Sequence, residues 1–460
     1  MVSTTSIPGR ISAALPLPQQ LPRLDTERLR SYRENLDFYE GRQWLEPERR
    51  RERRLTFNYA RTVIEKTASY AMSGVSFVVD PEDGSAEAAE RARRAERALR
   101  EVYDANALDQ LDFDSEIDCS VLGDAAYKVT WDGDDKRVRV SAPDVQGLYA
   151  WWLGDDPSRV WRVASRYVLT HEELEMLFGE TPSRNNEHTV VEVWTEPDFE
   201  VWVDGALFEE RANPYGFIPF VIYPNIREPK QFWGMSDLEA LKEPLRELNR
   251  AVTQLSMILE LSGNPIAVLE NVTEAHDIAV QPGAVWEVPE KAKAYLLDLL
   301  QGGGAGLHVD YANLVLRTLH DLAEVPRSAF GDNRQALSGV ALQMELDPLL
   351  KKVQRKRLVR GVAFRRLNEM ILRILEQHTG AQFAPYRTRA VWGPVLPQDR
   401  SRLAEDEARL VAAGVHSRRT AAGLLDVADP ETEWQRWQEE EGVEPPNQRT
   451  TKPGQSGGDE

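Results

Sequence analysis

One apolar stripe constrains the fold of this chain more than any other feature. Seven leucine and valine residues alternate in steps of three and four, in the order Leu238, Leu241, Leu245, Leu248, Val252, Leu255 and Leu259. Such spacing predicts a helix over residues 236–262 that needs a neighbouring helix along its whole length. We expect Ser236 or Asp237 to cap this helix and Pro244 to kink it.

The chain upstream of this stripe alternates between helical and strand patterns. Helices are predicted over residues 25–39, 58–74, 85–103 and 108–124. Strands are predicted over residues 75–80, 125–131, 136–142, 159–169, 189–195, 199–205, 206–211 and 218–225, with a hairpin turn at Asp132–Gly133. Residues 60–225 therefore favour an α+β fold with antiparallel strands.

A different pattern follows the stripe. Residues 263–305 contain short strand signals and end in "QGGGAG", and a second helix is predicted from about residue 307 to 325. The longest helix is predicted from about Ser338 to His378, with Pro348 bending or interrupting its early part. Small helices are expected over 398–440, and residues 441–460 have the composition of a disordered tail.

The stretch "PRSAFGDNRQALSGVAL", residues 326–342, joins these two helices. Pro326 ends the first helix and Ser338 is expected to cap the second. Phe330 is expected to anchor the loop against the helix ends, which leaves the polar tip Asp332–Gln335 to project. In an isolated chain, such a tip is an ordinary solvated connection.

Charge and cysteine content narrow the functional classes. The 56 basic and 75 acidic residues give 56 − 75 = −19, which argues against tight wrapping of nucleic acid or binding to an anionic membrane. Cys119 is the single cysteine, so an internal disulfide is excluded and a reducing compartment is expected. We expect neither a membrane span nor a secretory signal, a loose proline-rich N-terminal arm, and a protein kept in a cytoplasm.

Catalytic and metal-binding patterns do not stand out in the sequence. The seven histidines are scattered, and the chain contains neither a phosphate-binding P-loop nor a Gly-x-Ser-x-Gly elbow. We therefore predict no enzymatic activity, no metal and no cofactor. Two basic clusters, residues 48–54 and 351–361, favour salt bridges to neighbouring subunits or a solvated helix face, with contact to DNA as the alternative. In the second cluster the candidates for phosphate or intersubunit contacts are Lys351, Lys352 and Arg355.

Three motifs in this order resemble those of the portal proteins of tailed bacteriophages. "NPYGFIPFVIYPN" followed by "GMSDLEALKEPLRELNRAVTQ" is similar to the family's passage from its wing into its first stem helix. "VPRSAFGDNRQALSGVAL" is similar to its Phe-Gly-Asp turn before a Ser-Gly-x-Ala-Leu helix start. "LVAAGVHSRRTAAGLLDVADPETEWQRWQEE" is similar to its crown pattern. The matches together cover most of residues 30–440.

The resemblance implies the portal fold, an α+β wing with a two-helix stem, small clip, long wing helix and helical crown, assembled as a ring. The expected divisions are a flexible arm (1–29), wing (30–235), first stem helix (236–262), clip (263–305), second stem helix (306–325), tunnel loop (326–337), long helix with wing completion (338–397), crown (398–440) and disordered tail (441–460).

The resemblance also implies a function and partners. It predicts a ring, usually of twelve copies, at one capsid vertex of the virion, through which double-stranded DNA is packaged and ejected. The expected partners are the terminase packaging motor, the head-tail adaptor, and the major capsid and scaffolding proteins, with assembly in the host cytoplasm and no membrane.

Two sets of residues are the candidates for the channel. An acidic chain suits a channel along which a polyanion slides. The stem acids expected to give negative potential near the lumen are Glu239, Glu243, Glu247, Glu260, Asp310, Asp321 and Glu324. The tunnel-loop residues expected to touch DNA loosely are Asn333, Arg334 and Gln335, with Asp332 limiting how tightly.

Two other classes remain open at this point. A minor capsid or adaptor component would share the acidic, cysteine-poor composition, but it would not require two helices around a strand insert. An enzyme attached to packaging, such as a nuclease or hydrolase, would require a metal-binding carboxylate cluster. The sequence offers only acids on helix faces for that role.

Overall fold

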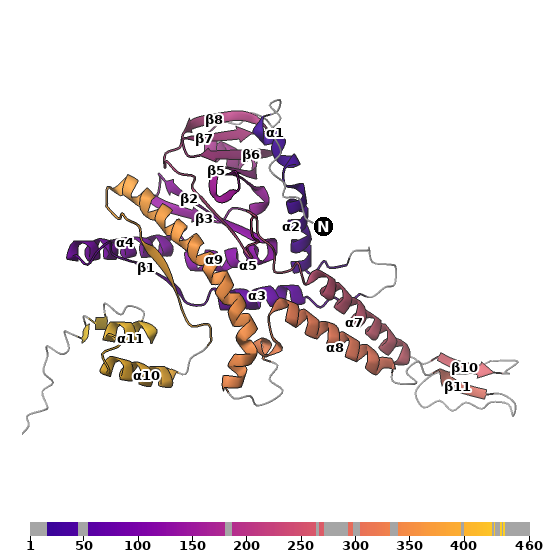
Figure 1. Cartoon of the computed structure of the whole chain (residues 1–460). Helices are drawn as coiled ribbons and strands as arrows, with labels where there is room; N and C mark the ends of the chain where they lie inside the picture. Colours follow the sequence, from indigo (N-terminus) through magenta and orange to yellow (C-terminus); the bar gives the residue numbers. More distant parts are fainter. Residues whose placement is uncertain are drawn as a thin grey trace, which may run out of the picture. The chain divides into compact units, whose positions relative to one another are not determined.

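The computed structural model divides the chain into two compact units, residues 1–393 and 394–460. The described residues are 16–44, 54–179, 186–263, 266–270, 293–297, 304–331, 339–396, 400–425, 427, 433–434 and 436–437. Helices and strands are mixed in the first unit, which confirms the α+β class. Figure 1 shows their arrangement.

Helices dominate the N-terminal part of the first unit. They are α1 (Leu17–Gln20), the 3-10 turn η1 (Leu21–Arg23), α2 (Thr26–Tyr39), α3 (Tyr59–Ala71), α4 (Ala86–Ala105) and α5 (Leu108–Leu122). Side-chain caps explain two of the starts: Asn58 accepts from the backbone N–H of Arg61, and Ser85 from that of Ala88. The four helices predicted here are confirmed.

Part of the predicted N-terminal arm is ordered, which corrects its boundary. Of the arm expected over 1–29, residues 16–29 include α1, η1 and the start of α2, and Leu21 is fully buried. Leu17, Leu24 and Leu29 pack against the same hydrophobic cluster. The prolines fit because they stand in the first turns of short helices, where a missing N–H costs no hydrogen bond.

Two small sheets adjoin the helices. The three-stranded sheet has the order β3-β2-β9, from β2 (Asp124–Asp132), β3 (Arg137–Ser141) and β9 (Phe220–Pro224). Asp132 pairs with Arg137 at the end of the β2–β3 ladder, which confirms the predicted hairpin. The two-stranded sheet pairs β1 (Val75–Val79) antiparallel with β12 (Thr388–Trp392), a strand that the sequence patterns did not indicate.

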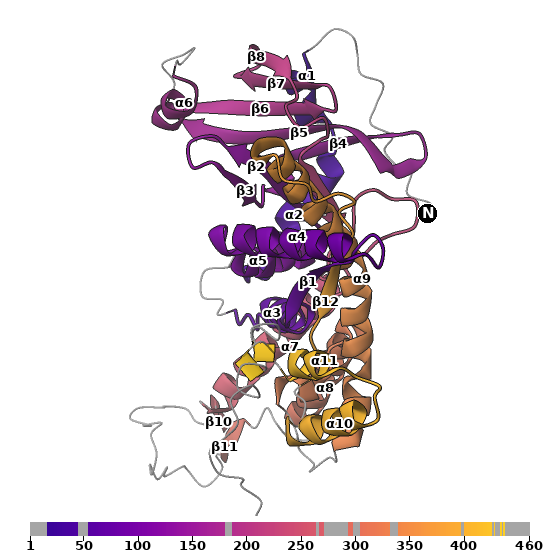
Figure 2. The same ribbon diagram turned by 90° about the vertical axis from the view of Figure 1, so that its left-hand side faces the viewer.

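A five-stranded antiparallel meander forms the largest sheet, with the order β4-β5-β6-β7-β8. Its strands are β4 (Leu148–Leu153), β5 (Asp156–Thr170), β6 (Glu187–Thr195), β7 (Asp198–Val203) and β8 (Ala206–Ala212). The short helix α6 (His171–Phe178) connects β5 to β6 and lies at one end of these long strands (Figure 2). Tyr149, Trp151, Val191 and Val193 form the buried cluster that α1 and η1 cover.

The remaining elements of the first unit include the longest helix. They are α7 (Lys242–Gly263), β10 (Ile266–Glu270), β11 (Lys293–Leu297), α8 (Gly304–Ala323), the 3-10 turn η3 (Arg327–Phe330) and α9 (Gly339–Thr379). The helix α9 continues through Pro348 without the predicted interruption. Leu346, Leu349 and Val353 are buried around this position, so their packing offsets the one backbone hydrogen bond that proline removes.

The second unit contains α10 (Arg400–Ala412) and α11 (Arg418–Leu424), in agreement with the small helices predicted there. The stretch "GVHSRRT", residues 414–420, joins the two helices, and its glycine and serine have a physical explanation. Gly414 has a φ of 70° just after α10, a conformation that suits glycine. Ser417 then caps α11 by accepting from the backbone N–H of Thr420 at 3.1 Å.

Candidate functional site: a two-helix stem and its buried anchor

Helices α7 and α8, here called the stem, lie side by side (Figure 1). In the chain, α7 precedes and α8 follows the antiparallel pair β10–β11, in which Ile266 pairs with Leu297 and Glu270 with Lys293. Two long helices thus bracket a strand pair. Strand β10 matches the strand signal "PIAVLE", whereas the second signal, "AVWEVP" at residues 284–289, lies outside the described residues and β11 was not indicated.

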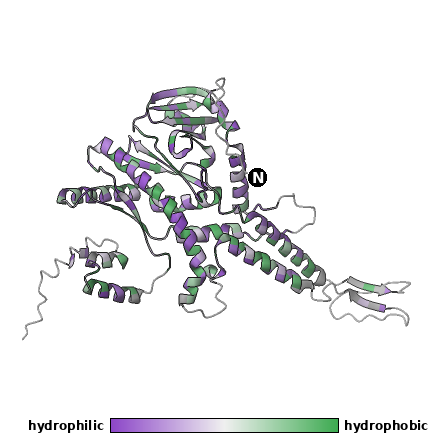
Figure 3. Cartoon of the chain, in the orientation of Figure 1, coloured by the Kyte–Doolittle hydropathy of each residue, from purple (hydrophilic) through white to green (hydrophobic). Residues whose placement is uncertain are grey.

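Burial changes along the stem. Leu248, in the first half of α7, is only 4% exposed, whereas Leu259, on the same stripe near its end, is 54% exposed. In α8, Leu319 is fully buried, while Leu307 and Leu314 are exposed. Apolar residues also continue to the far ends of both helices in Figure 3. The half of the stem nearest Lys242 and Ala323 is therefore packed within the chain, and the other half leaves apolar side chains uncovered.

The first stem helix begins later than predicted. Regular helix starts at Lys242, six residues after Ser236. The Ser236 hydroxyl donates to the Val121 carbonyl at 2.6 Å and accepts from the backbone N–H of Leu238, which fixes a turn before the helix. Pro244 consequently stands in the first turn, where its missing N–H has no helical partner to lose, so no kink is needed.

A cluster of buried charges lies beside this turn, and we call it the anchor. It consists of Glu116 on α5, Asp237 before α7, and Lys352, Lys356 and Arg360 on α9, all of them buried. The Arg360 guanidinium donates to both carboxylate oxygens of Glu116, at 2.6 and 3.1 Å. The Lys356 ammonium lies 3.1 Å from Glu116 and 2.8 Å from Asp237. Each buried charge thus has a partner of opposite sign.

Backbone and neutral groups complete the anchor. Lys356 also donates to the Ser120 hydroxyl at 2.7 Å and to the Asn225 side-chain oxygen at 2.6 Å. Lys352 donates to the carbonyl of Ala323 at 3.0 Å and lies 3.4 Å from Asp237. Because Ala323 ends α8 and Asp237 precedes α7, one lysine of α9 contacts the base of both stem helices. A cation is also favourable at a helix C-terminus.

The charges of the anchor shift the ionisation of its acids. Burial alone would raise the pKa of Glu116, but the nearby Arg360 and Lys356 cations lower it below its usual value. The pKa of Asp237 is likewise lowered, because Lys352 and Lys356 outweigh burial. Both groups are therefore carboxylates at neutral pH, and their contribution to stability is lost only as the pH falls through their lowered folded-state pKa values.

A close backbone approach explains two glycines beside the anchor. Gly123 ends α5 with a φ of 107°, and a side chain at Gly234 would meet the Gly123 carbonyl oxygen at 2.4 Å. The N–H of Gly234 donates to Asp124 at 2.8 Å. This contact brings the "GMSD" motif against α5, which is the physical reason for glycine in that motif.

The candidate stem acids mostly have basic partners. Glu239 lies 2.9 Å from Lys242, Glu243 lies 2.5 Å from Arg246, and Glu247 lies 3.2 Å from Arg250. Glu247 also accepts from the Tyr311 hydroxyl at 2.9 Å, which joins α7 to α8. The carboxylate of Glu324 accepts from Arg355 at 2.6 and 2.7 Å. Glu260, Asp310 and Asp321 are exposed on the stem.

The basic cluster on α9 is divided between the surface and the core. Lys351 and Arg355 are exposed, and they keep their place as candidates for intermolecular contacts. Lys352 does not, because its ammonium is buried against Ala323 and Asp237. Lys356 and Arg360 also pair inside their own chain, so the salt bridges expected with neighbouring subunits are intramolecular for these residues.

The four polar residues of the predicted tunnel loop, Asp332, Asn333, Arg334 and Gln335, lie outside the described residues, as does the basic cluster 48–53. Residues 326–331, which lead from α8 to this loop, belong to the described part of the chain. Gly331 follows η3 with a φ of 84°, and the Phe330 ring lies 5.6 Å from that of His320 on α8. This contact confirms that Phe330 anchors the segment to the stem.

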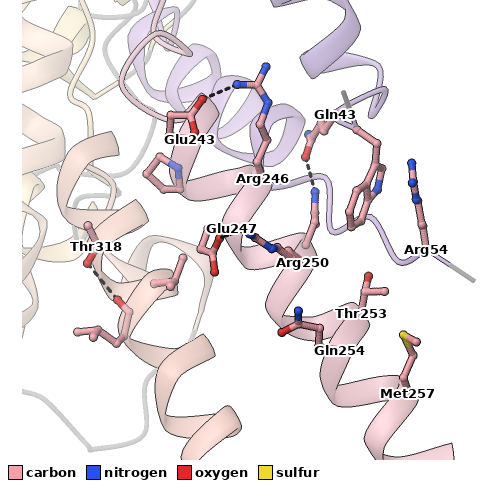
Figure 4. A pocket seen from close by; sticks show the side chains of 15 residues that line it. Gln43, Arg54, Glu243, Arg246, Glu247, Arg250, Thr253, Gln254, Met257 and Thr318 are labelled. Atoms are coloured by element: carbon pink, nitrogen blue, oxygen red, sulfur yellow. Dashed lines mark hydrogen bonds and ion pairs between the residues drawn. The ribbon is translucent and has the colours of Figure 1, made fainter. Parts of the chain in front are cut away.

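A groove of about 960 Å³ runs along the stem. Figure 4 shows side chains of α7 and α8 that line it, together with Gln43 and Arg54. Trp44 also belongs to the lining. Asn249 donates to Gln43 at 2.7 Å and accepts from the backbone N–H of Phe57 at the same distance. Gln43 and Phe57 are thus both hydrogen-bonded to Asn249 in the first half of α7, and the groove has a mixed lining that includes paired charges.

Groups that could perform chemistry are sparse among the described residues. In that part of the chain, no cluster of three His, Cys, Asp or Glu side chains is arranged to hold a metal ion. Cys119 is buried, and burial raises the pKa of its thiol, which disfavours the reactive thiolate. None of the described helices is both long and apolar enough to cross a membrane.

The sequence predictions missed the anchor, although α9 carries a signal for it. Lys352, Lys356 and Arg360 recur every four residues on the face that also holds Leu349, Val353 and Leu367. A basic row inside an apolar stripe indicates buried cations that require buried acids.

Comparison with protein families agrees with the fold and the stem. The profile of the family described as phage portal protein, SPP1 Gp6-like, matches residues 20–445. The chain therefore belongs to the phage portal proteins of the SPP1 Gp6-like family. A comparison with curated proteins gives no match.

Proposed function

We propose that this chain assembles into a ring-shaped channel at one capsid vertex, through which double-stranded DNA is packaged and ejected. The observation that carries the proposal is the uncovered apolar half of the stem. A leucine stripe that one chain buries only in part is stabilised when equivalent helices pack side by side around an axis. Family membership supports the same assembly, and we propose twelve copies.

In this proposal each part of the chain has its own role in the ring. The wing comprises residues 30–235 and 338–397, the stem helices form the channel wall, and the crown comprises residues 398–440. The clip, residues 263–305, docks the terminase motor and later the head-tail adaptor. Major capsid and scaffolding proteins contact the ring during assembly in the host cytoplasm, and the product is a part of the virion.

The contacts between the stem and DNA are proposed to be weak, because the acidic and charge-paired side chains of the stem attract phosphates little. Glu243 pairs with Arg246 and Glu247 with Arg250, which reduces the net charge of this part of the stem surface. Glu260, Asp310 and Asp321 are proposed to contribute negative potential near the lumen. Such a wall does not hold phosphates as a row of free arginines would. Residues 333–335 of the tunnel loop are proposed to touch DNA loosely.

Electron microscopy of the purified protein tests the proposal. Rings with a central hole are expected, and their top views give the copy number. Monomers or closed shells would instead favour the alternative, a minor capsid or adaptor component without a DNA channel. Neutralising Glu260, Asp310 and Asp321 should then change the packaging rate and its salt dependence, and an unchanged rate would remove these acids from the channel function.

A further inference from the structure

The helix α6 forms an acidic knob with apolar side chains at its tip. Its eight residues include Glu172, Glu173 and Glu175 but neither lysine nor arginine, and Met176 and Leu177 are 79% and 58% exposed. Exposed apolar side chains grouped on so short a helix are unusual for a surface in water. We refer to these five residues as the knob.

The knob is held rigidly. Thr170 and Glu173 form a capping box at its start, and Gly179 ends the helix with a φ of 75°. Phe178 packs edge to face against Phe208 of β8, with ring centroids 5.4 Å apart. A preorganised knob loses little conformational entropy when it binds.

A groove of about 1170 Å³ lies between β4, β5, β9 and α9. Leu358, which is 75% exposed, lines it together with the exposed side chains of Leu153, Trp161 and Val362. Its charged lining residues are Arg159, Arg227, Arg366, Arg373, Glu196, Asp198 and Glu369. Because Arg373 pairs with Glu369 at 3.7 Å, the remaining groups leave a small excess of positive charge.

The knob and the groove lie at opposite ends of one strand. β5 has 15 residues, which span roughly 45–50 Å. Its first residues, from Pro157, line the groove, and its last residue, Thr170, caps α6. Figure 2 shows α6 at one end of the large sheet and the β4–β5 turn at the other. Two different patches on opposite ends of a subunit are what a head-to-tail contact requires.

We propose that the knob of one subunit inserts into the groove of a neighbouring copy of this chain. Met176 and Leu177 pack on Leu358 and Val362, while the glutamates face the arginines of the groove. The partner is a second copy because one chain carries both the acidic, apolar-tipped knob and the basic-edged apolar groove. A head-to-tail contact that repeats by rotation closes into a ring, so this inference rests on the proposed function and specifies its outer interface.

Charge reversal in the otherwise unchanged chain tests whether the knob binds the groove. Glu172→Arg with Glu175→Arg reverses the knob, and Arg159→Glu with Arg366→Glu reverses the groove. Because like charges now face each other across the interface, each double variant should need about tenfold more protein, or more, for half-maximal ring assembly. Light scattering after size exclusion gives the assembled mass, and circular dichroism verifies folding. Glu87→Arg with Glu101→Arg on α4 is the matched control, expected to assemble normally.

Rescue separates a specific contact from general disturbance. An equimolar mixture of the two variants should assemble again, because reversed knobs then meet reversed grooves in alternation. The quadruple variant, with both reversals in one chain, should also form rings. Failure of both rescues while the single reversals remain folded would overturn the pairing, as would normal rings from each reversal alone.

Cross-linking gives an independent readout. Cys119 is buried, so Leu177→Cys with Leu358→Cys adds the two reactive thiols. Oxidation should produce a ladder of covalent oligomers on a denaturing gel, whereas either cysteine alone should give dimers at most. Rings without a ladder would refute the knob contact and leave the channel intact. Wild-type protein that never forms rings would instead refute the proposed function and this inference with it.

Discussion

The apolar side chains of α7 are buried by other parts of the chain near the first residue of the helix, whereas those near its last residues are exposed. At the base, Leu245 and Leu248 are buried, and the anchor ties Asp237, α5 and α9 together through paired charges. At the far end, Leu259 continues the same apolar stripe on an exposed surface, and Met257 on another face of the helix is exposed as well. One helix thus combines a fixed base with an end that can gain stability only from other molecules.

This difference separates folding from assembly along a single element. Substitutions at the base should reduce the stability of the monomer, because they remove contacts within the chain. Substitutions at the far end should leave the monomer unchanged and affect the ring alone. The predictions below test that separation.

The largest effect is expected at the centre of the anchor. Glu116→Gln leaves Lys356 and Arg360 buried without their shared carboxylate, and an uncompensated buried charge costs about 3–5 kcal/mol. Urea unfolding followed by circular dichroism measures the loss. The matched control is Glu90→Gln on the exposed surface of α4. This substitution should change the free energy of unfolding little, because the partner of Glu90, Arg97, remains in contact with water. Equal effects of the two substitutions would show that the anchor does not hold the base.

The same substitution at two positions of the stripe gives the sharpest comparison. Leu248→Ala removes a buried side chain and should cost about 2–4 kcal/mol of monomer stability. Leu259→Ala should leave the urea midpoint of the monomer nearly unchanged but raise the protein concentration needed for ring formation. A large loss of monomer stability from Leu259→Ala would contradict the division between base and far end.

Long helical patterns were predictable from the sequence, and contacts between distant segments were not. The predicted span of Ser338–His378 differs from α9 by one residue at each end, because many turns of apolar periodicity outweigh a single proline. The start of α7 was predicted wrongly because Ser236 is held by Val121, and Asp237 by Lys352 and Lys356, all of them more than 100 positions away. The pairing of Glu116 with Lys356 spans 240 residues, so local patterns cannot identify it.

The candidate site shows the same limit. The stem helices and strand β10 followed from spacing and local strand signals, whereas β11 was not indicated and the pairing of Glu247 with Tyr311 depends on how α7 meets α8. Strand β4, "LYAWWL", was missed because it is apolar on both faces and lacks the alternation of a half-buried strand. Burial of Lys352 could have been inferred from its place among leucines, but only by treating a basic residue as part of the core.

A buried acid outside the anchor predicts a pH effect of intermediate size. Asp112 is buried and accepts from the Tyr127 hydroxyl at 2.7 Å, and burial raises its pKa to about 7. Its folded-state pKa lies above the unfolded value, so its stabilising contribution is lost as the pH rises through about 7. Asp112→Asn should therefore raise stability relative to wild type at pH 8, by about 1–3 kcal/mol, with a smaller gain at pH 5. Thermal unfolding at both pH values measures the difference, and a larger gain at pH 5 would contradict the assignment.

The smallest effect is expected where the stem helices meet in solvent. The Tyr311 hydroxyl donates to Glu247, which also pairs with Arg250, so Tyr311→Phe leaves that carboxylate with a partner and with access to water. The urea midpoint of the monomer should not change measurably, since an exposed hydrogen bond is exchanged for one to water. Tyr311→Phe should also leave the ring intact, unlike Leu259→Ala, because it removes no apolar surface. A clear loss of monomer stability would mean that α7 and α8 are joined in the free chain more firmly than their burial indicates, and that the far end is part of the fold as well as of the assembly.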